Sequence, residues 1–407
     1  MNFAIPIQSA TFANLKNSIV SLDNTEVAFA GKSDEDLNRA YWLFKILSYN
    51  WLVKISPLFV NTAISLNLPI KGMVKATAFR QFCGGETIAD CEKTIRELGD
   101  YHIGTILDYS VEGKETEDDF EAGLRQTLAT IDNAKGNPNI PFSVFKPSGF
   151  IQFGLLEKIN AKKQLTEIEK AAFEKFRNRI QKICQAGFDN HVPIYIDAEL
   201  SWIQDVIDEL VRDMMMLYNK KEVMVYNTIQ MYRTDRLAFL KQAHEHAVQN
   251  NYKLGIKIVR GAYMEKERAR AARLGYPSPI QPDKILTDKA FDEALRFCVE
   301  HVDNIAICCG THNENSSLLL TELMLASKLP NNHPHLWFSQ LYGMSDHISY
   351  NLAKLGYNVS KYVPYGPVTS VLPYLIRRAQ ENTSVKGQTG RELWLIMQEK
   401  SRRKEDR

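Results

Sequence analysis

The stretch that decides the fold runs from residue 223 to residue 263. It reads VMVYNTIQMY (223–232), TDRLAFLKQAHEHAVQN (234–250) and LGIKIVRGAY (254–263). The first and third segments are short and rich in β-branched and aromatic residues, which favours buried strands. The middle segment carries apolar residues at helical spacing. Strand, helix and strand in this order predict one repeat of an alternating α/β fold.

The same alternation recurs along most of the chain. Six further runs are predicted strands: 104–111, 142–148, 192–199, 305–313, 336–344 and 358–366. Helical patterns lie between most of the runs, for example over residues 165–186. Eight such repeats are typical of a (β/α)8 barrel, and a chain of 407 residues is long enough for one. No GxGxxG motif follows the first strand, so a doubly wound dinucleotide-binding sheet is not favoured.

Composition excludes several classes of function. The chain is 44% hydrophobic and 24% charged, with a formal net charge of +2, as in an ordinary folded protein. It has no basic block and no basic stripe interleaved with aromatic residues, so nucleic acid is not an expected partner. The six cysteines show no CxxC spacing, which predicts reduced thiols and a cytosol-like compartment.

The N-terminal region bears on whether the protein crosses or contacts a membrane. The first residues do not form a signal peptide, and Asp23 and Glu26 disfavour a transit peptide. The most apolar stretch, 41–68, is interrupted by lysines and asparagines, so no membrane-spanning helix is expected. Residues 37–85 include no acidic residue but several lysines, which suits peripheral contact with an anionic membrane. Helices packed against the main domain are the alternative, and a cytoplasmic protein, with or without contact to the inner membrane, is expected.

Polar side chains stand at the ends of all eight predicted strands, where the chemistry of such barrels is located. They are Asp108 and Glu112, Lys146, Asp197 and Glu199, Gln230 and Tyr232, Lys257 with Arg260 and Tyr263, Thr311 with His312 and Asn313, Gln340, and Tyr362. Any one of them could be an ordinary strand-end residue. Together they indicate an active site at one mouth of the barrel.

Two chemistries compete with cofactor-dependent catalysis at such a mouth. His244 and His246 fall on a predicted helix, where alternate residues point apart, so no metal site is expected. A Schiff-base lyase that uses Lys146 or Lys257 is the better rival, because barrel aldolases place a lysine at a strand end. Hydrogen-bonding side chains spread over the fourth to sixth strands suit a large, flat, polar cofactor better.

Near the C-terminus, YLIRRAQE (374–381) places two arginines between an aromatic residue and a carboxylate. If this segment is helical, Tyr374, Arg377, Arg378 and Glu381 can share one face. Two guanidinium groups bind a carboxylate well. Taken alone the segment fits an exposed surface helix better, but the polar strand ends reverse that preference and favour a small carboxylate substrate.

Five strings in this sequence resemble the proline dehydrogenase family, in the family's order. They are KIVRGAY (257–263), GTHN (310–313), QLYGM (340–344), YVPYGPV (362–368) and YLIRRAQEN (374–382). The resemblance covers roughly residues 75–400 and is closer to the monofunctional, eukaryotic mitochondrial type and its bacterial relatives. It implies FAD-dependent oxidation of L-proline to 1-pyrroline-5-carboxylate, by hydride transfer from C5 to flavin N5, as the first step of proline catabolism to glutamate. It also implies a membrane quinone as electron acceptor and a pyrroline-5-carboxylate dehydrogenase downstream.

The resemblance also implies an architecture and residue roles. The α/β fold would be a distorted (β/α)8 TIM barrel over residues 101–400, with an N-terminal helical extension over 1–100 and the last barrel helix over the mouth. Implied substrate-binding residues are Lys146, Arg377, Arg378, Tyr263, Tyr374 and Leu341. Implied catalytic residues are Asp197, Lys257, Glu381 and Tyr362. Implied FAD contacts are Gln230, Val259, Arg260, Gly261, Ala262, Thr311, His312 and Asn313. Glu112 would pair with the first arginine and gate the site.

Three of these positions carry further expectations. Tyr362 stands where relatives that prefer 4-hydroxyproline have a smaller residue, so proline is the predicted substrate. Lys257 departs from the arginine of the bifunctional bacterial members. Glu381 could act as a base or only as a hydrogen-bond acceptor for the substrate amine.

Overall fold

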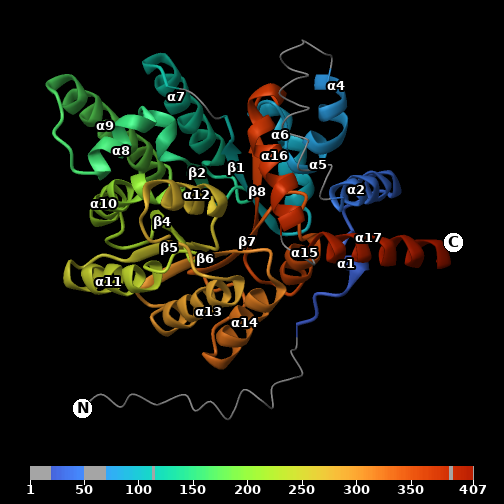
Figure 1. The fold of residues 1–407 in the computed structure, drawn as a ribbon. Coiled ribbons are helices and arrows are strands. Elements are labelled where there is room, and N and C mark those ends of the chain that lie inside the picture. Colours follow the sequence, from blue (N-terminus) through green and yellow to red (C-terminus); the bar gives the residue numbers. More distant parts are fainter. Residues whose placement is uncertain (1–19, 50–69, 112–114, 385–387, 407) are drawn as a thin grey trace, which may run out of the picture.

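The structure is a computed structural model, and it describes residues 20–49, 70–111, 115–384 and 388–406. Its centre is one sheet of eight parallel strands in the order β1-β8-β7-β6-β5-β4-β3-β2, wrapped by helices (Figure 1). The strands are β1 (Ile103–Tyr109), β2 (Ser143–Phe145), β3 (Ile194–Ile196), β4 (Val225–Gln230), β5 (Leu254–Val259), β6 (Ile305–Gly310), β7 (Leu336–Leu341) and β8 (Val359–Tyr365). The predicted α/β barrel is therefore confirmed.

A helix follows each strand, as the alternation predicts. The helices after β1 to β7 are α7 (Glu117–Ala134), α9 (Glu167–Asp189), α10 (Ser201–Tyr218), α11 (Arg236–Gln249), α13 (Lys284–Glu300), α14 (Glu314–Ala326) and α15 (Asp346–Lys354). Shorter helical pieces precede two of them: η3 (Pro147–Phe150) and α8 (Phe153–Asn160) come before α9, and α12 (Met264–Leu274) comes before α13. Local sequence explains the boundaries, since Thr166 and Glu169 form a capping box at the start of α9. Strand β2 is shorter than predicted because Pro147 has no N–H for the ladder and begins η3.

Side chains alternate between two packed layers along each strand. On β4, Val225 and Ile229 join the large core between strands and helices, whereas Tyr226 points into the barrel. Inside the barrel, the Phe142 and Tyr195 rings stack with centroids 4.4 Å apart. The interior is thus filled by side chains, and ligands have access at the mouth.

One junction of the barrel differs from the others. Strands β1 and β2 lie side by side, but within the described residues no hydrogen-bonded ladder joins them. Each of the other neighbouring pairs is linked by backbone hydrogen bonds. One backbone hydrogen bond, from the Thr105 N–H of β1 to the Asn139 carbonyl ahead of β2 over 2.7 Å, joins the two segments, and the ion pair of Lys146 and Asp108 adds a side-chain contact.

The two ends of the chain share a second core beside the barrel. The N-terminal elements are α1 (Thr25–Ala28), α2 (Asp34–Leu47), α4 (Ile70–Val74), the π-helical turn η2 (Lys75–Phe79), α5 (Arg80–Phe82) and α6 (Ile88–Gly99); the C-terminal helices are α16 (Val368–Ser384) and α17 (Gln388–Glu405). Phe44 of α2 packs in one cluster with Leu375 of α16 and Leu395 of α17. Helix α6 instead contributes Cys91 and Ile95 to the barrel core. The predicted domain boundary at residue 100 stays a prediction.

Helix α16 leaves the usual position of a barrel helix. It contacts α2, α4, η2 and α17, and in Figure 1 it stands with the N-terminal helices, at the end of β8. Leu341, at the end of β7, contacts both the cluster inside the barrel and the cluster that contains Tyr374 of α16. The last barrel helix therefore lies over the mouth, as predicted.

Two further observations concern the chain as a whole. All six cysteines are free and buried, and burial raises the pKa of Cys308 to about 11. None of the helices in the described part of the chain combines the length and the apolar character that a membrane span requires.

Candidate active site

The polar strand-end residues converge at the carboxyl end of the barrel. Lys146 and Asp197 directly follow β2 and β3, and Gln230 ends β4. Lys257 lies on β5 and Tyr362 on β8, and both are buried. Parallel strands of a barrel present their carboxyl ends to one face, so these side chains meet although they are far apart in sequence.

Asp197 is the centre of this arrangement. Its Oδ1 accepts hydrogen bonds from the Lys257 ammonium group and from the Tyr362 hydroxyl, the latter over 3.0 Å. The Lys257 Nζ also donates to the Tyr362 oxygen over 2.5 Å and lies 4.4 Å from the centre of its ring. Burial disfavours the charged carboxylate, but Lys257 and Lys146 outweigh it and hold the pKa of Asp197 below its usual range. Asp197 therefore stays ionised at neutral pH.

Lys146 lies between two carboxylates at the same mouth. Its Nζ is 3.2 Å from Oδ2 of Asp108 on β1 and 3.6 Å from Oδ2 of Asp197. Asp108 also accepts a hydrogen bond from Ser110 over 2.7 Å. The ammonium group is thus fixed beside Lys257 and its partners, with about a quarter of the side chain still exposed.

Helix α16 brings further cations over these residues. Arg378 is buried, and its guanidinium group lies 5.1 Å from the centre of the Tyr374 ring. Arg377, next to it, is half-buried. Glu381 belongs to α16, but its side chain lies outside the described part of the structure, as does Glu112. The predicted roles of these residues stay predictions.

The ends of β5 and β6 are tied together by Arg260. Its guanidinium group donates to Asp288 over 2.7 Å, to the Thr311 hydroxyl over 2.6 Å and to Ser316 over 3.0 Å. It also stacks 4.4 Å from the Phe291 ring centre. Two residues predicted to bind FAD, Arg260 and Thr311, are therefore in direct contact.

The loop after β5 is exposed and requires a glycine. Gly261 has φ +130°, and a Cβ atom there would lie 2.5 Å from the Tyr232 ring. Val259, just before the loop, is half-buried, while Ala262 is exposed and Tyr263 directly precedes α12. This loop leaves open backbone beside β5, which a flat ligand can approach.

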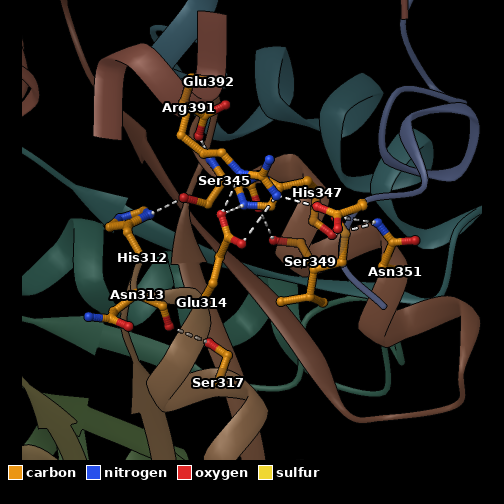
Figure 2. A network of polar contacts seen from close by, with 12 residues as sticks. His312, Asn313, Glu314, Ser317, Ser345, His347, Ser349, Asn351, Arg391 and Glu392 are labelled. Carbon is orange, nitrogen blue, oxygen red and sulfur yellow. Dashed lines mark hydrogen bonds and ion pairs between the residues drawn. The ribbon is translucent and has the colours of Figure 1, made fainter. Parts of the chain in front are cut away.

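His312 is held from the loop after β7 (Figure 2). Its Nδ1 lies 2.9 Å from Oγ of Ser345. Burial, followed by the charges of Lys361 and Arg378, lowers the pKa of His312 to about 3, so the half-buried ring is neutral at pH 7. The neighbouring Asn313 caps α14 by accepting from the Ser316 N–H.

The residues present at the mouth fit a flavin. Gln230 is buried, and its Oε1 has no hydrogen-bond partner among the described residues. An unpaired amide oxygen in a buried site is costly, and the N–H at the pyrimidine edge of a flavin is a donor that would pair with it. Thr228, two residues earlier on the same face of β4, also has an unpaired buried hydroxyl in this part of the structure.

Several residues of the site were not assigned a role from the sequence. Asp108 was noted only as a strand end, yet it pairs with Lys146. Ser345 was not noted, although it lies one residue after the QLYGM string. Its left-handed backbone, with φ +51°, is unusual for serine and leaves no signal in the sequence.

Ionised side chains gathered at the carboxyl end of a parallel barrel define the protein as a barrel enzyme. Comparison with known proteins adds the family, because a family model described as "Proline dehydrogenase" matches residues 91–391. The chain belongs to the proline dehydrogenase family. The predicted family and the predicted proline dehydrogenase enzyme are both confirmed.

Three relatives illustrate the similarity in sequence. "Proline dehydrogenase 1, mitochondrial" of Dictyostelium discoideum is 33% identical, over 96% of this chain and 76% of that protein. The carbapenem antibiotics biosynthesis protein CarD of Pectobacterium carotovorum subsp. carotovorum is also 33% identical, over 79% of this chain and 83% of its own length. "Hydroxyproline dehydrogenase" of Xenopus laevis is 29% identical, over 92% of this chain and 88% of that protein.

Solved structures support the fold. Proline utilization A (PutA) from Bdellovibrio bacteriovorus, inactivated by N-propargylglycine, superimposes with a TM-score of 0.70 at 17% identity and covers 95% of this chain. PutA from Corynebacterium freiburgense gives a TM-score of 0.65 at 18% identity over 84% of this chain. The chain spans 42% and 34% of those two longer proteins.

Proposed function

We propose that this proline dehydrogenase oxidises L-proline to 1-pyrroline-5-carboxylate with FAD, by loss of a hydride from C5 of the ring. The observation that carries the proposal is the buried network of Asp197, Lys257 and Tyr362, with Lys146 beside it, under the arginines of α16. When bound, FAD supplies the hydride acceptor at N5. The chain's own residues bind and orient the substrate and exclude water.

Binding of the substrate carboxylate is assigned to three cations. Arg377 and Arg378 come from α16 above the mouth, and Lys146 comes from the barrel rim. Guanidinium groups form paired hydrogen bonds with a carboxylate, and a lysine adds a compact charge. Three donors around one anion fix the orientation of the ring, which places C5 for reaction.

The ring of the substrate needs a shaped, water-poor pocket. Tyr374, Leu341 and Tyr263 are assigned as its walls, of which Tyr374 is buried and Leu341 touches both neighbouring clusters. Tyr362 is held by Lys257 and Asp197, so its ring cannot turn aside. We therefore propose that Tyr362 excludes a substrate with a hydroxyl group on C4, which favours proline over 4-hydroxyproline.

Asp197 is assigned a holding role rather than that of a base. Two lysines keep it ionised, so it would be a weak proton acceptor at neutral pH. It instead fixes Lys257 and Tyr362 beside the reacting ring. The substrate nitrogen must be uncharged for its lone pair to assist hydride loss, and Glu381 is assigned as the partner of that nitrogen.

FAD is assigned to the ends of β4 to β6. Gln230 offers its unpaired Oε1 to the flavin edge, and Val259, Arg260, Gly261 and Ala262 follow along the cofactor. Thr311, His312 and Asn313 would hold the part nearer the pyrophosphate and adenosine, with His312 neutral and able to donate or accept. Glu112 is assigned as a gate that pairs with Arg377.

The Schiff-base alternative has less support. Lys257 donates to Asp197 and to Tyr362, and Lys146 lies between two carboxylates. Neighbouring carboxylates favour the charged ammonium form, whereas a Schiff-base lysine must react as a neutral amine.

The electron acceptor is assigned as a membrane quinone. Trp42 and Ile46 lie four residues apart on α2 and are exposed, as is Tyr49 just after the helix, and the Lys45 ammonium group lies 4.9 Å from the Trp42 ring. Exposed aromatic residues with lysines suit the interface of an anionic bilayer. In a eukaryotic cell the proposal places the enzyme at the mitochondrial inner membrane. In a bacterium it places the enzyme in the cytoplasm, against the inner membrane. A pyrroline-5-carboxylate dehydrogenase would consume the product.

An anaerobic titration with L-proline, followed by visible absorption, tests cofactor, substrate and reaction together. The expected result is a yellow protein whose flavin bands bleach as proline is added. A colourless protein that cannot be reconstituted with FAD would overturn the proposal. Trapping of substrate by borohydride on Lys146 or Lys257 would support the lyase instead.

A further inference from the structure

Two adjacent residues of the C-terminal helix contact two segments at the mouth: Glu392 contacts the loop after β7, and Arg391 contacts the start of α14 after β6. Glu392 of α17 is buried, and its carboxylate accepts a hydrogen bond from the backbone N–H of Ser345. Ser345 in turn holds His312 through its hydroxyl, over 2.9 Å. Figure 2 shows His312 and Ser345 joined by this contact, with Glu392 and Arg391 above them. A residue of the last helix is thus connected to His312 through one intermediate.

Arg391 holds the segment after β6, which contains His312. Its guanidinium group donates to both carboxylate oxygens of Glu314, over 2.9 and 3.3 Å. Glu314 comes directly after Asn313 and also contacts His347 over 3.0 Å. Arg391 further pairs with Asp23 in the N-terminal region. The start of α17 is therefore connected to this segment at two points, directly at Glu314 and through Ser345 at His312.

The intermediate, Ser345, is itself held in an unusual conformation. Its φ and ψ are +51° and +43°, in the left-handed region that serine rarely adopts. Lys361 donates to the Met344 carbonyl over 2.6 Å, and Gln81 donates to the Gly343 carbonyl over 2.9 Å. Such a conformation persists only where the surroundings hold it. The Glu392 carboxylate supplies the contact at the Ser345 N–H.

A purely stabilising role explains Glu392 poorly. Burial of a carboxylate costs free energy, and a backbone N–H can be satisfied by a neutral acceptor at lower cost. What the carboxylate adds is a strong, directed hydrogen bond at one atom of the loop that holds His312.

We propose that Glu392 is a positioning residue for FAD, which acts by fixing Ser345 and through it the ring of His312. This inference rests on the proposed function, which assigns His312 to the cofactor. Helix α17 then helps to retain the cofactor, although it lies far from His312 in the sequence. Arg391 supports the segment that contains His312 through Glu314.

The test compares the release of FAD from diluted holoenzyme, measured by the rise of flavin fluorescence. Glu392→Ala is expected to release FAD about tenfold faster, the effect of losing one charge-assisted hydrogen bond. Glu392→Gln should restore part of the retention, because its amide oxygen still accepts from Ser345 but carries no charge. Ser345→Ala keeps the backbone bond but removes the hydroxyl, and it should also release FAD faster.

Glu399 provides a matched control on the same helix. It is fully buried and binds Arg402 and Arg403 over 2.7 to 2.9 Å. Glu399→Ala should lower the melting temperature without changing FAD release at a temperature well below melting. Equal acceleration by Glu399→Ala and Glu392→Ala, or no acceleration by Glu392→Ala, would overturn the inference.

Amide hydrogen exchange separates this inference from the proposed function. Segments 311–314 and 342–346 should exchange faster in Glu392→Ala than in the unmodified protein, and Glu399→Ala should leave both unchanged. A colourless unmodified protein would refute the assignment of FAD, and the exchange of the two segments would still decide whether Glu392 positions the loop. Unchanged exchange in Glu392→Ala would refute the positioning itself.

Discussion

Lys257 on β5 donates a hydrogen bond to Asp197, which follows β3, across the mouth of the barrel. The lysine is buried and the carboxylate nearly so, and the Tyr362 hydroxyl bonds to both. Charges in such a poorly solvated site interact strongly with their neighbours. The pair therefore sets the electrostatic environment of whatever reacts there.

Replacing Lys257 tests this environment. Lys257→Met should slow flavin reduction by proline by about 10²-fold or more, because one preorganised charged donor is lost from the reacting site. Single-turnover anaerobic bleaching of the flavin measures it. Lys257→Arg retains the cation and should keep most of the rate. A loss in Lys257→Met no larger than in Lys257→Arg would contradict the role of the charge.

The arginines of α16 are expected to act on the substrate and not on the cofactor. Arg377→Met or Arg378→Met should weaken proline binding about 10-fold to 100-fold, the effect of losing a hydrogen bond to a charged group. Flavin content should stay unchanged. Equilibrium titration with proline and the visible spectrum measure the two quantities. Arg402→Met, at a partly exposed residue of α17, should change neither. Equal loss of proline and FAD would contradict the assignment.

Tyr362 is expected to determine substrate preference through its ring. Tyr362→Ser should raise kcat/KM for 4-hydroxyproline relative to proline about tenfold, since relief of a steric conflict of one group has that order of effect. Tyr362→Phe keeps the ring and loses the hydroxyl, so it should retain the preference while slowing both substrates. A preference unchanged in Tyr362→Ser would remove this residue as the determinant.

A buried ion pair behind the barrel wall should stabilise the fold. Asp208 on α10 and Arg236 on α11 are both buried and lie 2.6 Å apart. Arg236→Met should lower the free energy of unfolding by about 3–5 kcal/mol, because it leaves the Asp208 carboxylate without its cation. Urea unfolding followed by circular dichroism measures it. Arg212 is half-exposed and 3.5 Å from Asp213, so Arg212→Met should cost less than about 1 kcal/mol. Similar losses in both variants would refute the prediction.

The neutral His312 should make stability depend on pH. Its pKa is about 3 in the folded protein and 6.5 when unperturbed. Between these values the unfolded chain binds the extra proton, so stability is present above pH 6.5 and falls as the pH drops toward 3. His312→Gln should reduce the difference in urea midpoint between pH 5 and pH 7.5, measured at fixed FAD concentration. Parallel pH profiles for variant and unmodified protein would exclude His312 as the source.

Much of the barrel could be predicted because its signals are local. Short apolar runs indicated the strands, and apolar residues at helical spacing indicated the helices. The predicted helices 165–186 and 234–250 correspond to α9 and α11 within a few residues. The position of the mouth could be predicted from the strand ends, because parallel strands of a barrel all end at the same face. Short strands such as β2 were predicted too long, because the apolar run continues past the point where Pro147 stops the ladder.

The parts of the site that the sequence did not predict depend on contacts between segments that are far apart in the sequence. Nothing near Lys146 indicates that Asp108, 38 residues earlier, is its partner. The bond from Glu392 to Ser345 spans 47 residues and depends on a backbone conformation that no pattern records. The shared core of the N-terminal and C-terminal helices is likewise a property of the assembled fold.

Lys146 also contributes a contact at the junction between β1 and β2. In the described structure, seven neighbouring strand pairs are joined by backbone ladders, whereas this junction has one backbone hydrogen bond, from Thr105 to Asn139, and the ion pair of Lys146 and Asp108. An ion pair weakens with salt and fails when its carboxylate is protonated, unlike a backbone ladder. If Lys146 also binds the substrate carboxylate, an arriving anion competes with Asp108 for the same ammonium group. Substrate binding and the side-chain contact between β1 and the end of β2 then depend on the same ammonium group.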